Sequence, residues 1–428
     1  MMIGTLLVII YLMLCVWKNA IWILSSLILI FPAHLTIKQL LQVSTGSIGI
    51  FPLWYDIAIF TLLIKSFYYK HFPIKQKGLI ILFVIVLCYY FSLSYFTYKP
   101  DPESLSTFRI YLHCLAIFTS LSILKFTKEN LRQLKTTLLI SSVIYSITGI
   151  LIYFFFQYEA HLLLGHIEFI NGSIQYTTPS FLIMGIERMF GLIGGPNQFG
   201  VFLSIIILYI YFIMNNTSKH NNIRLIKISL ILSITCCIFT FSRAGWGIIV
   251  MTIGLVYVMK GKLSNIIGLI FSMIIVLGVI FIILYYIAPD FANIIMASFT
   301  GEEASASVRG DIIKNGFSQI LENMLGHGLG TCIEENGSSI SESSIIICLY
   351  EIGIIGTALY YYLMIHISYI LYKKKLIYSK LIFSLTIATI IASVVSMNPF
   401  QFPYIYFYWG TLGLATNKSI QKLNYYYL

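Results

Sequence analysis

The sequence predicts an all-α protein, a polytopic transmembrane helical bundle of about 12 or 13 spans with a large late loop outside the membrane. Of the 428 residues, 58% are hydrophobic and only 10% are charged, whereas soluble domains carry about a quarter charged residues. The apolar residues form long runs, and basic residues gather in alternate loops. Because a helix satisfies its own backbone hydrogen bonds in lipid, we expect one integral membrane domain over residues 1–428.

The apolar runs approach the length of about 20 residues that a helix needs to cross a bilayer. They cover residues 2–17, 20–36, 50–68, 78–97, 107–124, 135–156, 192–214, 226–241, 244–260, 264–288, 344–371, 379–397 and 402–416. The first two and the last are short, so the count of spans stays open by one. The first run lacks a basic segment before it and a convincing cleavage site after it, so we expect a retained span rather than a signal peptide.

The net charge is +11, from 27 basic and 16 acidic residues, and it is unevenly distributed among the loops. Basic residues concentrate in alternate loops, which favours a membrane topology by the positive-inside rule over a nucleic-acid partner. With the basic loops inside, residues 157–191 and 289–343 become the longest outer (periplasmic) loops, and long loops are often functional. The seven cysteines have no metal-ligand or disulfide-framework spacing, and we expect no metal and no cofactor.

The second outer loop contains a segment with the period of an amphipathic helix, residues 305–325. Such a helix would lie on the membrane surface or close over the bundle. Arg309 falls on its apolar side, where a guanidinium either extends to water or points at an anion.

Arginines, unlike lysines, fall mainly on the outer side. Arg109, Arg188, Arg243 and Arg309 lie outside in the predicted topology, and only Arg132 and Arg224 lie inside. Arginine pairs bidentately with phosphate or carboxylate. Since Arg188, Arg243 and Arg309 lie at outer span ends or in the largest outer loop, we expect them to form one anion site. The alternative is local pairing, as between Arg188 and Glu187, with anchoring at the interface.

A glycine-rich stretch, residues 191–200, follows Arg188 at the outer start of a span. Its glycines permit close approach of a ligand to the backbone, and Pro196 suits the first position of a helix. Asn197 offers a donor and an acceptor at a helix N-terminus, which is a favourable place for an anion. The stretch follows no predicted strand, so it does not indicate a nucleotide-binding fingerprint.

Glu342 is the acidic residue that we expect to act as a general base. It stands directly before the span that starts near Ser344, where desolvation at the membrane edge would tune its pKa. The alternative is an acid favoured at a helix N-terminus by the macrodipole. Glu351 lies about two turns deeper and should face protein rather than lipid. His327, in Gly-His-Gly-Leu-Gly, is a second candidate base.

Together these segments resemble the bacterial O-antigen polymerase and O-antigen ligase family. Its members combine many spans with an Arg-x-x-Gly…Pro-Asn stretch, a Ser-Arg pair at a span edge and a late periplasmic loop that carries arginine and glycines. The matching residues are Arg188/Gly191/Pro196/Asn197, Ser242/Arg243, Arg309, Gly326/Gly328/Gly330, Glu342 and Glu351/Gly353/Gly356. The ligases usually carry a histidine where this chain has Glu342, which favours the polymerase.

The resemblance implies a metal-independent glycosyltransferase, a polymerase of the Wzy type, in the bacterial inner (plasma) membrane. It would join oligosaccharide repeat units carried on undecaprenyl diphosphate at the periplasmic face, and a chain-length regulator is a candidate partner. Arg188, Arg243, Arg309 and Asn197 would bind the diphosphate, and Arg309 and Glu342 would act in catalysis. The alternatives are a ligase that transfers the glycan to lipid A core, and a flippase or transporter of lipid-linked oligosaccharides.

Overall fold

The computed structural model describes most of the chain outside the region 262–342. The described residues are 2–46, 48–67, 74–98, 102–170, 173–176, 181–183, 186–216, 223–261, 286, 320–321, 323–332, 343–376, 378–396, 400 and 402–422. In order, the elements are α1 (Met2–Trp17), α2 (Ala20–Ile30), η1 (Phe31–Ala33), α3 (His34–Thr45), η2 (Phe51–Leu53), α4 (Trp54–Phe67), α5 (Ile74–Tyr98), α6 (Pro102–Ile123), α7 (Lys128–Phe155), α8 (Gln157–Leu163), β1 (Ile167–Ile170), β2 (Ser173–Tyr176), β3 (Leu182–Ile183), β4 (Ile186–Glu187), α9 (Pro196–Asn216), α10 (Ile223–Phe239), α11 (Arg243–Met259), α15 (Ser344–Lys373), α16 (Ser379–Val395), α17 (Tyr404–Thr416) and α18 (Lys418–Lys422).

Helices lie where the apolar runs predict them. Every run contains a helix except 264–288, which lies outside the described residues apart from Tyr286. Within the described segments, the helical stretches long and apolar enough to cross a membrane are Ala20–Thr45, Ser104–Ile123, Lys128–Phe155, Pro196–Asn215 and Ser344–Lys373. The predicted helical fold with helices of span length is thereby confirmed for the described residues, while the count of 12 or 13 spans stays a prediction. The amphipathic helix and most of the loop 289–343 lie outside the described residues.

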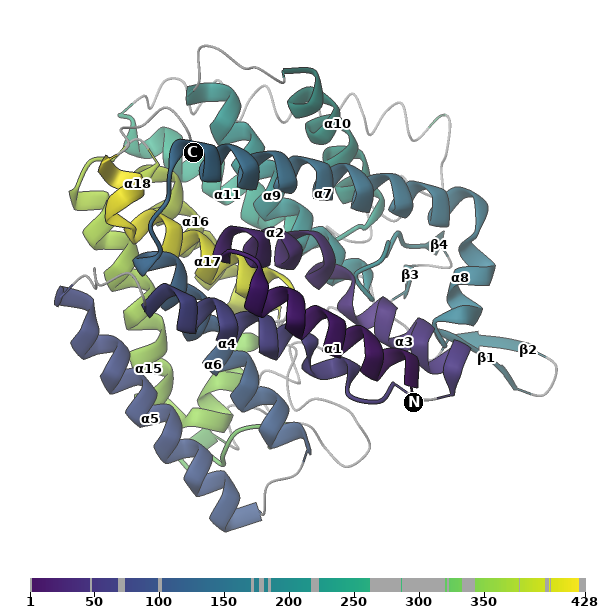
Figure 1. Ribbon diagram of the computed structural model, residues 1–428, viewed down its shortest axis with the longest axis horizontal. Coiled ribbons are helices and arrows are strands. Elements are labelled where there is room, and N and C mark those ends of the chain that lie inside the picture. The colour runs from purple at the N-terminus through teal and green to yellow at the C-terminus, as the bar shows by residue number, and fades with distance from the viewer. Residues whose placement is uncertain are drawn as a thin grey trace.

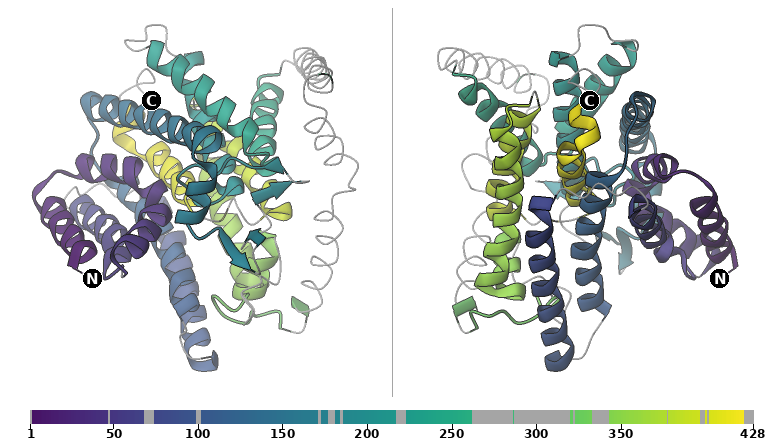
Figure 2. Two further views of the ribbon diagram at one scale, coloured as in Figure 1. Left: turned by 90° about the vertical axis from the view of Figure 1, so that its right-hand side faces the viewer. Right: turned by 60° about the vertical axis from the view of Figure 1, so that its left-hand side comes forward.

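The helices pack closely where small residues face each other. In Figures 1 and 2, α9, α10 and α11 gather beside α7, and α5 and α15 lie together on another side of the bundle. A Cβ on Gly245 would lie 2.6 Å from the carbonyl oxygen of Gly200, and one on Gly413 would lie 2.8 Å from that of Phe118. Such small residues let helix backbones approach in lipid, where apolar burial alone does not drive helices together.

The contacts of α16 with α11 and α15 show which helix ends lie at the same end of the bundle. Lys380 Nζ at the start of α16 donates to the carbonyl oxygen of Met259 at the end of α11. At the other end of α16, the carbonyl oxygen of Ser393 accepts from Ser343 Oγ, which precedes α15. The starts of α11 and α15 therefore lie at the same end, which is the outer end in the predicted topology. Arg243 begins α11 at this end.

The described residues of the segment 157–191, which the predicted topology places on the outer side, include short strands that the all-α prediction did not contain. The segment contains α8 and two short antiparallel hairpins, β1–β2 and β3–β4, with Ile167 paired to Tyr176 and Leu182 to Glu187. The sequence between β1 and β2 is Asn171-Gly172, the strongest short-range hairpin signal. The prediction missed these strands because they are only two to four residues long.

Candidate functional site

Arg188 is buried, with 5% of its surface exposed, and directly follows β4 near the end of the segment 157–191. Its Nη2 donates to Asn197 Oδ1 at 2.6 Å, and its Nε donates to the carbonyl oxygen of Thr240 at 2.9 Å. Its backbone N–H donates to the carbonyl oxygen of Phe181 at 2.9 Å. Arg188 and Asn197, which are both predicted to bind the anion, are therefore in direct contact. Their hydrogen bond helps to fix the orientation of the guanidinium group.

Glycines bring the start of α9 against the turn between α10 and α11. Pro196 is the first residue of α9, as predicted. A Cβ on Gly200 would overlap Ser242, and Gly191 has a φ of 58° and would place a Cβ 2.9 Å from the ring of Phe199. Neither position accepts a larger residue without a shift of its neighbours, so the stretch 191–200 is shaped by packing as well as by any ligand.

The turn between α10 and α11 carries the second predicted arginine. Ser242 caps α11 by accepting a hydrogen bond from the Gly245 N–H, and its Oγ donates to the carbonyl oxygen of Asn197 at 3.4 Å. Arg243 follows as the first residue of α11 and is exposed. We call Arg188, Asn197, Thr240, Ser242 and Arg243 the arginine cluster. An anion at the N-terminus of α11 would also gain from the helix dipole.

The other two predicted site residues, Arg309 and Glu342, lie outside the described residues. Glu342 directly precedes Ser343, whose side chain caps α15 by accepting a hydrogen bond from the Ile346 N–H. This helix starts at Ser344, as the sequence predicts, at the same end of the bundle as Arg243.

The glycines of the late motifs form a crossing of two backbones. Gly353 interrupts the helical geometry of α15 with φ 66° and ψ −179°, and Gly326 has a φ of 97°. A Cβ on Gly353 would overlap the carbonyl group of Leu325, and a Cβ on Gly326 would lie 2.6 Å from the carbonyl oxygen of Glu351. The segment 323–332 therefore docks directly onto the kink of α15.

Hydrogen bonds close this crossing. The N–H groups of His327 and Gly328 donate to the carbonyl oxygens of Tyr350 and Glu351 at 2.8 and 2.9 Å. A kink at Gly353 removes helical donors from these carbonyls, and backbone groups at membrane depth must find partners within the protein. The docked segment supplies those partners, which accounts for the two glycine motifs in structural terms.

Glu351 and His327 have roles in this docking. Glu351 is 1% exposed, and its Oε1 accepts from the Gly330 N–H at 3.0 Å, which confirms that it faces protein. The ring of His327 stacks on Tyr350 at 4.1 Å between ring centroids.

A second charged cluster was not predicted from the sequence. Asp56, in the first turn of α4, pairs with Arg109, whose Nη2 also donates to Tyr55 OH at 3.1 Å. His113 Nε2 lies 2.8 Å from Asp56 Oδ1, and His113 is fully buried. The available signal was the spacing of Arg109 and His113, four residues apart on one face of a helix, together with the solitary acid in an apolar span.

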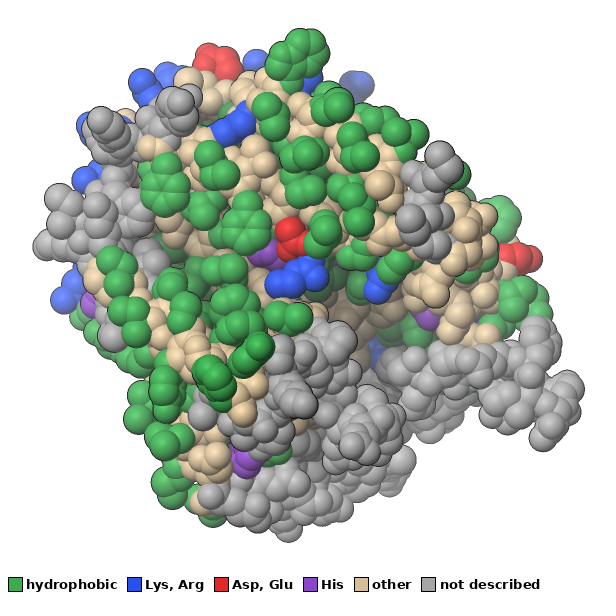
Figure 3. Space-filling model, turned by 60° about the horizontal axis from the view of Figure 1, so that its bottom comes forward, with side chains coloured by type: hydrophobic (Ala, Val, Ile, Leu, Met, Phe, Trp, Pro, Cys, Tyr) green, Lys and Arg blue, Asp and Glu red, His purple; other side chains and the backbone are tan. Residues whose placement is uncertain are grey.

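The corner between α2 and α3 connects the two clusters. Trp54 lies two residues before Asp56, and its Nε1 donates to His34 Nδ1 at 2.9 Å. Two residues further along α3, Thr36 Oγ1 donates to the carbonyl oxygen of Leu192 in the glycine-rich turn. Figure 3 shows basic, acidic and histidine side chains side by side at the edge of a hollow, within an otherwise largely hydrophobic surface.

An aromatic cluster in the outer loop supports Arg188. His166 stacks on Phe181 with ring centroids 4.2 Å apart, and His161 lies 4.6 Å from Phe190. Burial lowers the pKa of both histidines to about 4, and each histidine therefore stays neutral near pH 7. Because Phe181 accepts the backbone hydrogen bond of Arg188, this cluster fixes the chain segment that carries the guanidinium.

The fold and these clusters describe a helical membrane protein with arginines gathered at one end of its bundle. No group of three or more His, Cys, Asp or Glu side chains in the described part of the chain is arranged to hold a metal ion. The family model Wzy_C, described as O-Antigen ligase, matches residues 228–361, less than a third of the 428 residues. No curated protein matches the chain.

The family match supports the O-antigen ligase family and, with the apolar helices, a membrane protein with a role in O-antigen or related polysaccharide assembly. It includes Arg243, Arg309, Glu342 and the kink at Gly353, while Arg188 lies before it. It supports a glycosyltransferase-like enzyme without separating polymerase from ligase.

Proposed function

We propose that this chain is a polymerase that joins oligosaccharide repeat units carried on undecaprenyl diphosphate, at the outer face of the bacterial inner membrane. The observation that carries the proposal is the contact of Arg188 with Asn197 against the turn that leads into Arg243. The segments that carry Arg188 and Arg243, which are far apart in the sequence, therefore lie together at one end of the bundle. A diphosphate is the ligand whose charge and geometry suit such a site.

In the proposed reaction, an acceptor hydroxyl attacks the anomeric carbon of the donor glycan. The new glycosidic C–O bond forms as the bond to the lipid diphosphate breaks, and the bonding electrons leave with the diphosphate. Arg188, Arg243 and Arg309 would stabilise the charge that develops on this leaving group, an electrostatic contribution that is often worth several kcal/mol. Glu342 would accept the proton of the attacking hydroxyl.

The roles of Arg309 and Glu342 are tested by conservative substitution. Arg309→Lys keeps the charge but removes the fork, so polymer should be lost if bidentate contact with the diphosphate is needed. Glu342→Gln keeps the shape but removes the base. Arg132→Lys, near the start of α7 at the opposite end of the bundle, is the matched control and should leave polymer length unchanged. Normal polymer length in Arg309→Lys or Glu342→Gln would contradict the assigned role.

The ligase is the second candidate, because the matching family model is described as O-Antigen ligase. It would use the same donor and transfer the glycan to the lipid A core. Glycan analysis of a deletion strain separates the two activities. Loss of a polymerase leaves single repeat units on the core, whereas loss of a ligase leaves bare core, and bare core would refute the polymerase.

A further inference from the structure

A cavity of about 750 Å³ lies at the end of the bundle opposite to the arginine cluster. It is lined by the last turns of α9, α11 and α15 and by the start of α16. The helices α9 and α11 begin at the arginine cluster and end at this cavity. The 21 residues of α9 span roughly 30 Å at about 1.5 Å per residue, which is about the thickness of the hydrocarbon core of a bilayer.

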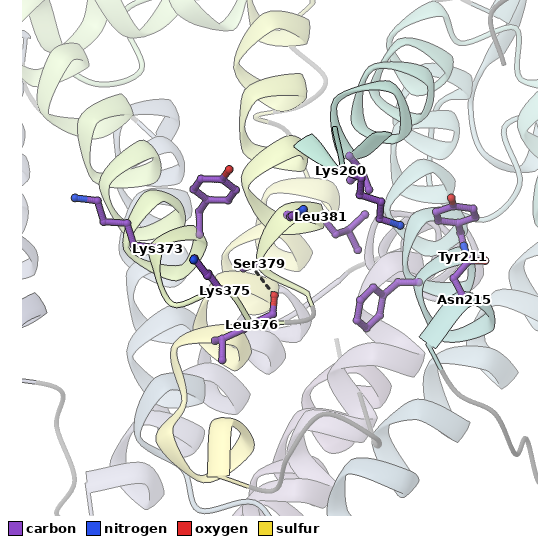
Figure 4. A pocket seen from close by; sticks show the side chains of 12 residues that line it. Tyr211, Asn215, Lys260, Lys373, Lys375, Leu376, Ser379 and Leu381 are labelled. Carbon is purple, nitrogen blue, oxygen red and sulfur yellow. Dashed lines mark hydrogen bonds between the residues drawn. The ribbon is translucent and has the colours of Figure 1, made fainter. Parts of the chain in front are cut away.

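Lysines from three different segments surround the cavity. They are Lys260 after α11, Lys373 and Lys375 at the end of α15, and Lys380 in α16, and no acidic side chain is among the lining residues that the structure describes. In Figure 4, Lys260 and Lys375 come from opposite sides of the cavity, whereas the amine of Lys373 points away from them. The Lys373 amine lies 4.7 Å from the ring centroid of Tyr369, and the Lys260 amine lies 5.6 Å from that of Tyr257. Lys380 Nζ donates to the carbonyl oxygen of Met259 at the end of α11. Because the Lys373 amine is directed away, Lys260, Lys375 and Lys380 are the lysines that we assign to the charge of the cavity.

Most of the remaining lining residues are apolar or aromatic. Phe212, Val256, Leu376 and Leu381 form apolar wall, and Tyr211 and Asn215 add polar atoms near the rim. Lysines beside apolar wall suit an amphiphile, in which a phosphate group adjoins hydrocarbon. A phosphate without a hydrocarbon chain would leave this apolar lining unused.

The position of the cavity favours a membrane lipid as its ligand. Its lysines lie in or beside loops that the positive-inside rule assigns to the cytoplasmic side. On that side, anionic headgroups bind to basic pockets between transmembrane helices. We propose that this cavity binds the phosphate headgroup of an anionic phospholipid of the cytoplasmic leaflet, held by Lys260, Lys375 and Lys380. This site is separate in place and ligand from the site of the proposed function.

The test measures binding of dioleoylphosphatidylglycerol to the purified full-length protein in neutral detergent, by native mass spectrometry, against dioleoylphosphatidylcholine. The variant Lys260→Gln/Lys380→Gln should bind phosphatidylglycerol about 25-fold more weakly, since each lysine near a headgroup contributes about five-fold. The matched control, Lys125→Gln/Lys128→Gln, removes the same charge from another basic loop that does not line the cavity, and should bind like the unaltered protein. Lys260→Arg/Lys380→Arg should retain binding.

Three results would overturn the proposal: equal binding of the two lipids, equal loss in the control variant, or displacement of phosphatidylglycerol by an equal concentration of inorganic phosphate. The last would assign the cavity to a free anion instead. If the double glutamine variant does not fold, the single variants Lys260→Gln and Lys380→Gln replace it, each with an expected loss of about five-fold, against Lys125→Gln as the single control.

Discussion

Replacing Asn197 by aspartate separates an anion-binding role of Arg188 from a purely structural one. Asn197 Oδ1 accepts from Arg188 Nη2 at 2.6 Å, and aspartate keeps this acceptor in nearly the same place. The substitution also adds a negative charge, which pairs with the guanidinium. If Arg188 only ties the outer loop to α9, Asn197→Asp should retain activity.

If Arg188 binds a diphosphate, the new carboxylate competes with it. When one guanidinium binds both the new carboxylate and the diphosphate, their negative charges lie about 5.5 Å apart. Two like unit charges at this distance repel by about 3 kcal/mol at an effective dielectric constant of about 20. We therefore expect a fall of roughly 100-fold in the rate of polymer formation. Thermal stability should stay equal to that of the unaltered protein or rise, because the bond to a charged acceptor is stronger than the bond to an amide.

The assay is polymer length and amount in a complemented deletion strain, with protein level and melting temperature measured on purified protein. Asn197→Ala is the matched comparison, since it leaves a buried donor without this acceptor and should cost about 1–3 kcal/mol of stability. Full activity in Asn197→Asp, with unchanged stability, would refute the diphosphate role of Arg188.

Three further predictions concern the structure around the site. Gly353→Ala should destabilise the protein by about 3 kcal/mol, because the residue has φ 66° and would overlap neighbouring backbone, whereas Gly254→Ala, in open space, should leave the melting temperature unchanged or raise it. Stability should fall as pH drops from about 6.5 toward 4, because the folded state keeps His161 and His166 neutral with pKa values near 4 while the unfolded chain binds protons; a flat melting profile in this range would contradict that burial. Asp56→Asn should lower stability by roughly 2 kcal/mol by leaving a cation in the cluster unpaired, and an unchanged unfolding midpoint would show that the pair contributes nothing.

The positions of the helices can be predicted from the sequence because every segment within the bilayer must satisfy its own backbone hydrogen bonds. A run of apolar residues must close its own hydrogen bonds, and nearly every such run is helical. The start of α9 at Pro196 was predictable for a different local reason, because proline lacks a backbone N–H and suits the first position of a helix. The contact of Arg188 with Asn197 was within reach because the two are only nine residues apart.

Other features depend on contacts that no local pattern encodes. Asp56 and Arg109 are separated by 53 residues, and only the packing of α4 on α6 brings them together. Likewise, Gly326 and Gly353 entered the sequence analysis only as residues that match the resembled family, whereas the structure uses them for a crossing of two backbones. The sequence marked these glycines as important but indicated no physical role for them.

The most direct measurement is chain growth by the purified protein in liposomes supplied with undecaprenyl-diphosphate-linked repeat units and no ion gradient. We expect a ladder of lipid-linked products with increasing numbers of repeats, and no ladder when Arg188 is replaced by lysine. Unchanged single repeat units, together with transfer to added lipid A core or with movement across the bilayer, would contradict this expectation and identify a ligase or a transporter.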